Sequence, residues 1–191
     1  MIQQGVNVGL PSLIVVAGQI ASGKTTLAAG LSNRAAYEHL RVRQVLRELL
    51  GGSDWDRDRL QREGASLDVR TSGRWLMEYV IERMERSPLL ILDSGRTRRQ
   101  VEPILEGLSN VALVYLDASE GARRARYAKA AGIDPLKRGV SFGAAMAHET
   151  EREAKDLRAM SHLVVDTDGL DATLVLDEVD HGLLHPPSSS P

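Results

Sequence analysis

The sequence lacks cysteine altogether and is poor in aromatic residues, which make up 4% of its 191 residues. Without thiols the chain cannot form disulfides, thiolate metal sites or cysteine nucleophiles, and a reducing cytoplasm suits it. No apolar run approaches the ~20 residues that cross a bilayer, and residues 1–11 lack the basic and apolar regions of a signal peptide. The formal net charge of −2 gives no bulk attraction to nucleic acid or membranes. We therefore expect a cytoplasmic protein with neither of these as a partner, and the composition indicates no particular oligomeric state.

The pattern of apolar segments indicates one α/β domain. The chain is 42% hydrophobic and 26% charged, and its length is sufficient for one hydrophobic core. Segments with helical periodicity separate five predicted strands: 13–17, 35–39, 89–93, 111–117 and 162–166. This alternation predicts a five-stranded parallel sheet with helices on both faces and ligands at the carboxyl ends of the strands. We expect residues 1–184 to form this domain and the Pro- and Ser-rich residues 185–191 to be a disordered tail.

Some connections are harder to assign. Helical spacing over 42–50 ends at two glycines, after which Ser53 or Asp54 can cap a charged helix that runs to about Glu63. Residues 132–147 carry several glycines and a proline, so we expect them to be irregular or mobile.

A glycine-rich motif follows the first predicted strand. It has the spacing Gly, four free positions, Gly, Lys, then Ser or Thr, and a second threonine, Thr26, follows: Gly18, Gln19, Ile20, Ala21, Ser22, Gly23, Lys24 and Thr25. An apolar strand precedes the motif, and Leu27, Ala28 and Leu31 recur after it at helical spacing. The alternative is a glycine turn with a solvated lysine, but strand, loop and helix are all present. The context indicates an ATP-binding phosphate loop, and hence a three-layer P-loop NTPase fold.

The residue types of this loop suit Mg-ATP. Glycines allow the backbone N–H groups to point inward at phosphate oxygens, and the following helix adds the positive end of its dipole. Lys24 would reach the β- and γ-phosphates, and the Thr25 hydroxyl would bind Mg²⁺, which prefers oxygen ligands.

The third predicted strand ends in Asp93, and three arginines follow: Arg96, Arg98 and Arg99. From this position a carboxylate can help to hold Mg²⁺, although Asp93 could equally cap the next helix. Cations oppose the dipole at a helix N-terminus, so a phosphate-binding role for Arg96 is favoured over a solvated first turn.

Two further basic clusters have less specific signals. Arg41, Arg43 and Arg47 lie near the second strand and the following helix, where they could bind an acceptor. The helix after the fourth strand carries Arg123, Arg124, Arg126 and Lys129. A mobile arginine-bearing segment could close over a nucleotide and stabilise the transferring phosphoryl group, but a solvated basic face explains the same pattern.

These motifs together resemble the P-loop nucleoside monophosphate kinases, in particular the adenylate kinase-like and dephospho-CoA kinase-like branch. The similarity covers the phosphate loop, Val45-Leu46-Arg47-Glu48, and Asp93-Ser-Gly-Arg96-Thr97 with Gln100 and Glu102. The resemblance implies that Arg47 and Arg96 hold the phosphate of the acceptor. It also implies that Arg126 opens a lid at about 123–147 and acts in catalysis, and that the adenine of ATP lies near the turn at 166–169.

The acceptor is the open question. Dephospho-CoA kinases carry an aspartate after strand two that activates a hydroxyl, and here only Glu38 stands nearby. A phosphate acceptor is already a nucleophile and needs only positioning. We therefore expect a kinase that uses ATP and Mg²⁺ to phosphorylate a small phosphorylated acceptor such as a nucleoside or deoxynucleoside monophosphate. Lys24, Asp93 and Arg126 would be catalytic, Thr25 and Asp93 would hold the metal, and Arg43, Arg47 and Arg96 would bind the acceptor. A kinase of a hydroxyl acceptor and an ATP-binding regulatory module are the alternatives.

Overall fold

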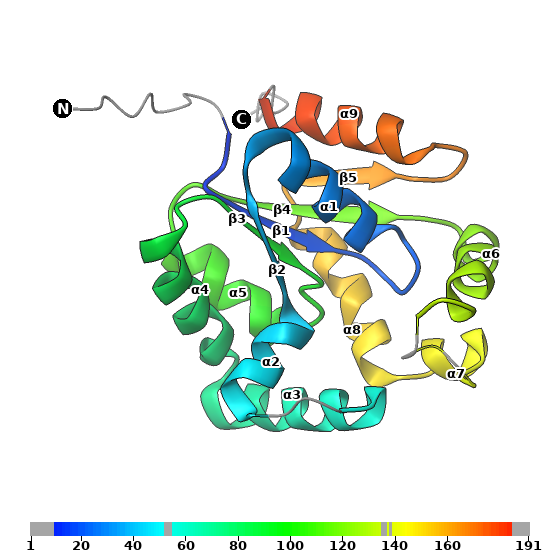
Figure 1. Ribbon diagram of the computed structural model, residues 1–191, viewed down its shortest axis with the longest axis horizontal. Coiled ribbons are helices and arrows are strands. Elements are labelled where there is room, and N and C mark those ends of the chain that lie inside the picture. The colour runs from blue at the N-terminus through cyan, green and yellow to red at the C-terminus, as the bar shows by residue number, and fades with distance from the viewer. Residues whose placement is uncertain (1–9, 52–54, 135–136, 138, 185–191) are drawn as a thin grey trace.

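A computed structural model describes residues 10–51, 55–134, 137 and 139–184 and shows one parallel β-sheet with helices on both faces (Figure 1). The strands are β1 (Leu13–Ala17), β2 (Glu38–Arg41), β3 (Leu90–Asp93), β4 (Val111–Asp117) and β5 (Leu163–Asp166), in the order β2-β3-β1-β4-β5. All four strand pairings are parallel. The predicted five-stranded parallel sheet is confirmed.

Nine α-helices lie within the described residues: α1 (Lys24–Ala35), α2 (Val42–Leu50), α3 (Arg57–Thr71), α4 (Arg74–Arg86), α5 (Arg98–Gly107), α6 (Glu120–Ala131), α7 (Phe142–Met146), α8 (Glu149–Asp156) and α9 (Ala172–Leu184). A short 3-10 helix, η2 (Leu157–Met160), follows α8. Within the part of the chain that the structure describes, no helix is both long enough and apolar enough to cross a membrane.

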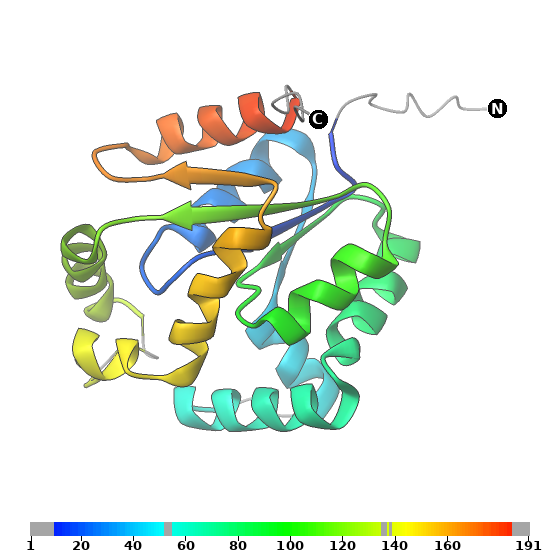
Figure 2. The same cartoon turned by 180° about the vertical axis from the view of Figure 1, so that it is seen from behind.

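The central strand β1 feeds two hydrophobic cores because successive side chains of a strand point to opposite faces. Leu13 and Val15 pack with the buried faces of α2, α4 and α5, whereas Ile14 and Val16 pack with α1 and α9. The two opposite views show the same division, with α1 and α9 on one face and α4, α5 and α8 on the other (Figures 1 and 2). Burial on both faces explains why β1 is an unbroken apolar run.

The strand register brings residues that are distant in sequence together at the carboxyl ends of the strands. Asp93 pairs with Val16 of β1 and with Arg41 of β2, and all three strands end at this level. The phosphate loop begins directly after β1, and α3 lies beyond the sheet at the bottom of both views. Main-chain topology thus collects the phosphate loop, Asp93 and Arg41 in one place.

Three predicted boundaries were wrong. The second strand starts at Glu38, not at residue 35, because α1 continues to Ala35 and ends at Ala36, which has φ 56°. The charged helix α3 extends to Thr71, well past residue 63, and its N-cap is Asp56, which accepts from the Arg59 amide. Ser53 and Asp54 lie outside the described residues. The segment predicted to be irregular contains the short helix α7, capped by Ser141; the proposed tail at 185–191 lies outside the described residues.

Candidate active site

The phosphate loop adopts a conformation that depends on two glycines. Gly18 has φ 136°, and a Cβ there would lie 2.5 Å from the Leu116 carbonyl oxygen. Gly23 has φ 105° and serves as the N-cap of α1, with no side chain bonded to the helix N-terminus. A glycine N-cap has no side chain to accept from the first amides of α1, so these amides can donate to an anion.

Lys24 lies folded over this loop. Its Nζ donates to the carbonyl oxygens of Gly18 and Gln19, at 2.7 Å each. Burial lowers the pKa of Lys24 to about 8, although the nearby Glu151 carboxylate opposes the shift. A phosphate at this position would compensate the desolvated ammonium group.

Asp93 is 2% exposed and sits at the centre of a small polar network. The Ser94 hydroxyl donates to Oδ1 at 2.8 Å, and His39 Nε2 lies 3.1 Å from Oδ2. Burial by itself raises the pKa of Asp93, but hydrogen bonds with His39, Ser94 and Thr25 outweigh it, so the pKa lies below its usual value. The carboxyl group is therefore ionised at neutral pH.

The oxygens of Thr25 and Asp93 fit the hard ligands that Mg²⁺ prefers. The described residues contain no group of three or more His, Asp or Glu side chains that could hold a metal alone. Mg²⁺ usually keeps several waters and shares substrate phosphates, so one carboxylate and one hydroxyl beside a phosphate loop suit it.

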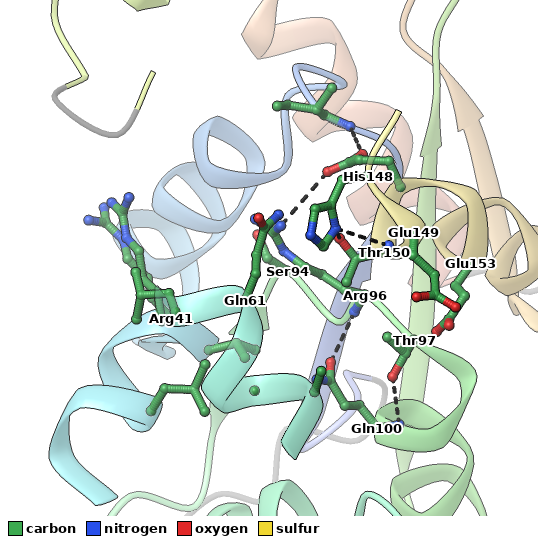
Figure 3. Close-up of a pocket in the computed structure, with 18 of the residues that line it drawn as sticks. Arg41, Gln61, Ser94, Arg96, Thr97, Gln100, His148, Glu149, Thr150 and Glu153 are labelled. Atoms are coloured by element: carbon green, nitrogen blue, oxygen red, sulfur yellow. Dashed lines mark hydrogen bonds and ion pairs between the residues drawn. The ribbon is translucent and has the colours of Figure 1, made fainter. Parts of the chain in front are cut away.

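A cavity of about 480 Å³ opens beside Lys24 and Asp93. Four arginines line it, from the β2–α2 junction and from the start of α5: Arg41, Arg43, Arg96 and Arg99. Apolar side chains of α2 and α3 line another part: Val42, Leu46, Leu60, Ala65 and Val69. Figure 3 shows Arg41 on one side of the cavity and Arg96 on the other.

Arg96 is held by Gln100, which belongs to the motif noted in the sequence, and by Glu151, which the sequence did not single out. Its amide donates to Gln100 Oε1 at 3.3 Å, and its guanidinium lies 3.8 Å from the Glu151 carboxylate. Gln100 in turn donates to the buried Asp68 at 2.9 Å. Asp68 also accepts from Trp75 Nε1 at 2.6 Å, and burial raises its pKa despite these hydrogen bonds.

Two of the predicted site arginines do not line this cavity. Arg47 donates to the Trp55 carbonyl oxygen at 3.2 Å, which ties α2 to the segment before α3. Arg126 donates to the side chain and carbonyl of Thr167, at 2.8 and 2.6 Å. It lines a separate hollow of about 130 Å³ that also contains Thr26 and Gly23. In this structure the guanidinium groups of Arg47 and Arg126 are hydrogen-bonded away from the cavity, and their roles at the acceptor and the transferring group stay predictions.

The basic segment that was expected to act as a lid packs against itself and against the phosphate loop. Arg123 is buried, donates to the Ala118 carbonyl oxygen at 3.2 Å and lies over the Phe142 ring of α7. Tyr127 and Phe142 form a small core with Ile20 of the phosphate loop. From this segment Lys137 lines the cavity.

Glu38, the nearest carboxylate to the position of the hydroxyl-activating aspartate, is at the wrong end of its strand. It begins β2, whereas the cavity lies beyond the end of β2. Its carboxylate accepts from Arg83 Nε at 2.6 Å. Glu38 is therefore not a candidate base.

The chain matches the profile of the AAA_33 family, described as an AAA domain, over residues 13–138. No curated protein sequence matches it. Among solved structures, it is similar to a shikimate kinase from Aquifex aeolicus vf5, with 16% identity, a TM-score of 0.61, and coverage of 93% of this chain and 99% of the other. Acinetobacter baumannii shikimate kinase in complex with shikimate gives 19% identity, a TM-score of 0.62 and coverage of 94% and 96%. A gluconokinase from Sinorhizobium meliloti 1021 gives 19% identity, a TM-score of 0.55, and coverage of 92% of this chain and 93% of the other. These likenesses confirm the P-loop kinase fold.

Proposed function

The chain belongs to the AAA_33 family, and on that premise we propose that it transfers the γ-phosphoryl group of Mg-ATP to a small phosphorylated acceptor. A nucleoside or deoxynucleoside monophosphate suits the site best. The observation that carries the proposal is the set of arginines at positions 41, 43, 96 and 99, which line the same cavity as Lys24 and Asp93. Carboxylates also line the cavity, but a planar guanidinium binds phosphate through paired hydrogen bonds, and four of them in one cavity suit a phosphorylated acceptor.

The donor phosphates would lie on the amides of the phosphate loop, with Lys24 neutralising their charge. Thr25 and Asp93 would hold Mg²⁺, which supplies charge neutralisation on the donor phosphates when bound. Because Asp93 is ionised and fixed by His39 and Ser94, it is ready for this role.

The acceptor would enter between the arginines and the apolar part of the cavity. Its phosphate oxygen would attack the γ-phosphorus in line, and the bond from that phosphorus to the bridging oxygen would break and release ADP. Arg96 would align the acceptor phosphate, together with Arg41 or Arg43 opposite. The apolar side chains Leu46, Leu60 and Ala65 provide a surface for a flat ring. Such an acceptor needs no protein base, and Glu38 cannot provide one.

Arg126 takes a different role in this proposal. Beside Gly23 and Thr26, on the outer side of the phosphate loop, it would support the nucleoside end of ATP rather than the transferring group.

A hydroxyl acceptor is the second candidate, and Asp68 is the observation that favours it. Its buried carboxyl lines the cavity, and its pKa is raised by burial, which suits a group that accepts a proton from a hydroxyl. The similar structures include a shikimate kinase and a gluconokinase, whose names denote hydroxyl-bearing acceptors.

The deciding experiment is ADP formation from Mg-ATP in the presence of single acceptors. The panel would contain the common ribo- and deoxynucleoside monophosphates, dephospho-CoA, shikimate and gluconate, with Arg96→Ala and Asp68→Asn variants assayed beside the parent protein. Turnover with a monophosphate that Arg96→Ala loses would support the main proposal. Turnover only with a hydroxyl compound, lost in Asp68→Asn, would replace it with the second candidate. ATP binding without turnover on any acceptor would favour a regulatory module.

A further inference from the structure

A carboxylate from the far end of the chain reaches the phosphate loop. Glu151, in the first turn of α8, accepts from the Ile20 amide through Oε2 at 2.6 Å, across 131 positions of sequence. Its backbone carbonyl oxygen accepts from Gln19 Nε2 at 3.3 Å. The residue is 3% exposed, so this carboxylate is buried against the loop.

The Ile20 amide is one of the loop donors that can serve an anion. Successive N–H groups of such a loop form a concave anion site, and a carboxylate oxygen accepts from them in the same way as a phosphate oxygen. Glu151 therefore accepts a hydrogen bond from an amide that would otherwise donate to a phosphate oxygen of ATP.

The Glu151 carboxylate is also surrounded by the cationic groups that would bind a phosphate. Its second oxygen, Oε1, lies 3.8 Å from Arg96 Nη1, and its charge raises the pKa of Lys24 against the effect of burial. The carboxylate thus faces an amide of the loop, the loop lysine and an arginine of the acceptor side. These are the three kinds of group that a transferring phosphoryl would meet.

We propose that the Glu151 carboxylate occupies a phosphate position of the loop in the nucleotide-free protein and is displaced when the triphosphate binds. Two anions cannot share one amide donor, and their like charges repel each other. Displacement also removes the partner of Arg96, so that its guanidinium becomes available for the acceptor. Binding of the donor would in this way prepare the acceptor side. The inference rests on the phosphate loop alone and does not require any particular acceptor.

The competition has a measurable consequence. If only the molecules with Glu151 withdrawn can bind the phosphates, the apparent dissociation constant equals the intrinsic one divided by the fraction of such molecules, and is therefore higher. Removing the carboxylate should then tighten nucleotide binding. Glu151→Gln removes the charge but keeps the shape and an oxygen that can accept the hydrogen bond from the Ile20 amide. Glu151→Ala removes the charge and that oxygen.

The test is equilibrium binding of Mg-ADP and of magnesium pyrophosphate to the full chain by calorimetry, with no acceptor present. We expect Glu151→Ala to bind both ligands about tenfold more tightly, with Glu151→Gln between it and the parent protein. Pyrophosphate carries no base, so its gain would place the effect at the phosphates. Asp156→Asn makes the same charge change at an exposed position of α8 and should leave both affinities unchanged.

Unchanged or weaker binding by both Glu151 variants would overturn the proposal and make Glu151 a support for the loop. Thermal unfolding of each variant establishes that it is folded, and if Glu151→Ala does not fold, Glu151→Gln decides. Because the experiment involves no turnover, its outcome is separate from that of the acceptor panel.

Discussion

The donor side and the acceptor side of the cavity are built by different means. On the donor side, eight consecutive residues from Gly18 to Thr25 provide the site, largely through backbone amides held by one strand and one helix. On the acceptor side, the lining comes from side chains of α2, α3 and the start of α5, among them Asp68 and Gln100, which are hydrogen-bonded to each other. The donor side is built from one continuous stretch of sequence, whereas the acceptor side is assembled from residues that are far apart in sequence.

This difference has consequences for function. A backbone site is fixed by glycine positions and changes little when neighbouring side chains change, so it suits a donor that is the same in many enzymes. A side-chain site can be altered one residue at a time, so it suits acceptors that differ between relatives. The following predictions test whether the two sides are as separate as the structure indicates.

The largest expected effect is on the donor side. Lys24→Ala should lower turnover by about 10³-fold or more, because it removes the positive charge that the loop places on the transferring phosphoryl. Turnover with the acceptor found in the panel is the measurement, and the melting temperature is the check on folding. Lys129→Ala, which removes an exposed lysine from α6, should retain full activity. Activity of Lys24→Ala close to that of the parent protein would refute the donor assignment.

Most of the fold could be predicted from the sequence because burial on both faces leaves a clear signal. β1 and β4 were predicted with the observed boundaries, and β3 and β5 to within one residue. β2 was misplaced because it lies at the edge of the sheet and buries only Leu40 fully, so its sequence carries little periodicity. The end of α3 was missed because its charged sequence has no continuous apolar stripe.

The candidate site was predictable only where it is local. The loop residues and Asp93 follow strands directly, so topology alone brings them together. Whether an arginine faces the cavity depends on its direction on a helix and on its partners: Arg43 lines the cavity, whereas Arg47, one turn later, bonds to Trp55. Asp68 and Glu151 gave no signal in sequence, because their roles depend on contacts across 32 and 131 positions.

The next effect belongs to the acceptor side. Arg96→Ala should lower kcat/KM for the acceptor by about 10²-fold, the size expected for one charged hydrogen-bonding group, and leave the affinity for ADP nearly unchanged. Arg98→Ala is the matched control, since Arg98 is exposed and pairs with Glu102 on the surface of α5. An equal loss of ADP affinity in Arg96→Ala would show that the two sides are not separate.

A smaller effect is expected from pH on the donor side. The pKa of Lys24 is about 8, so the ammonium is charged below this pH and neutral above it. Phosphate binds the charged form better, so affinity for ADP should be constant just below pH 8 and fall by up to about tenfold per pH unit above it. Calorimetric titrations between about pH 7.5 and 9.5 avoid the phosphate ionisation near pH 6. Lys24→Arg stays charged throughout and should show no such fall; a fall of the same size in that variant would assign it to another group.

The smallest effect is expected on stability, from Arg47, which lies on α2 next to the acceptor side but does not line the cavity. Arg47→Ala removes the hydrogen bond to the Trp55 carbonyl, but it also removes a buried Nε for which the described residues provide no partner, so the two changes partly offset each other. We expect a loss of stability of about 1 kcal/mol, or a fall of about 2–4 °C in Tm, with kcat/KM for the acceptor unchanged. Arg86→Ala, which removes one partner of an exposed pair on α4, should alter neither quantity. If Arg47→Ala instead lost acceptor turnover as Arg96→Ala does, at an unchanged Tm, Arg47 would belong to the acceptor side. Its bond to Trp55 would then have to exchange for one to the acceptor during the reaction.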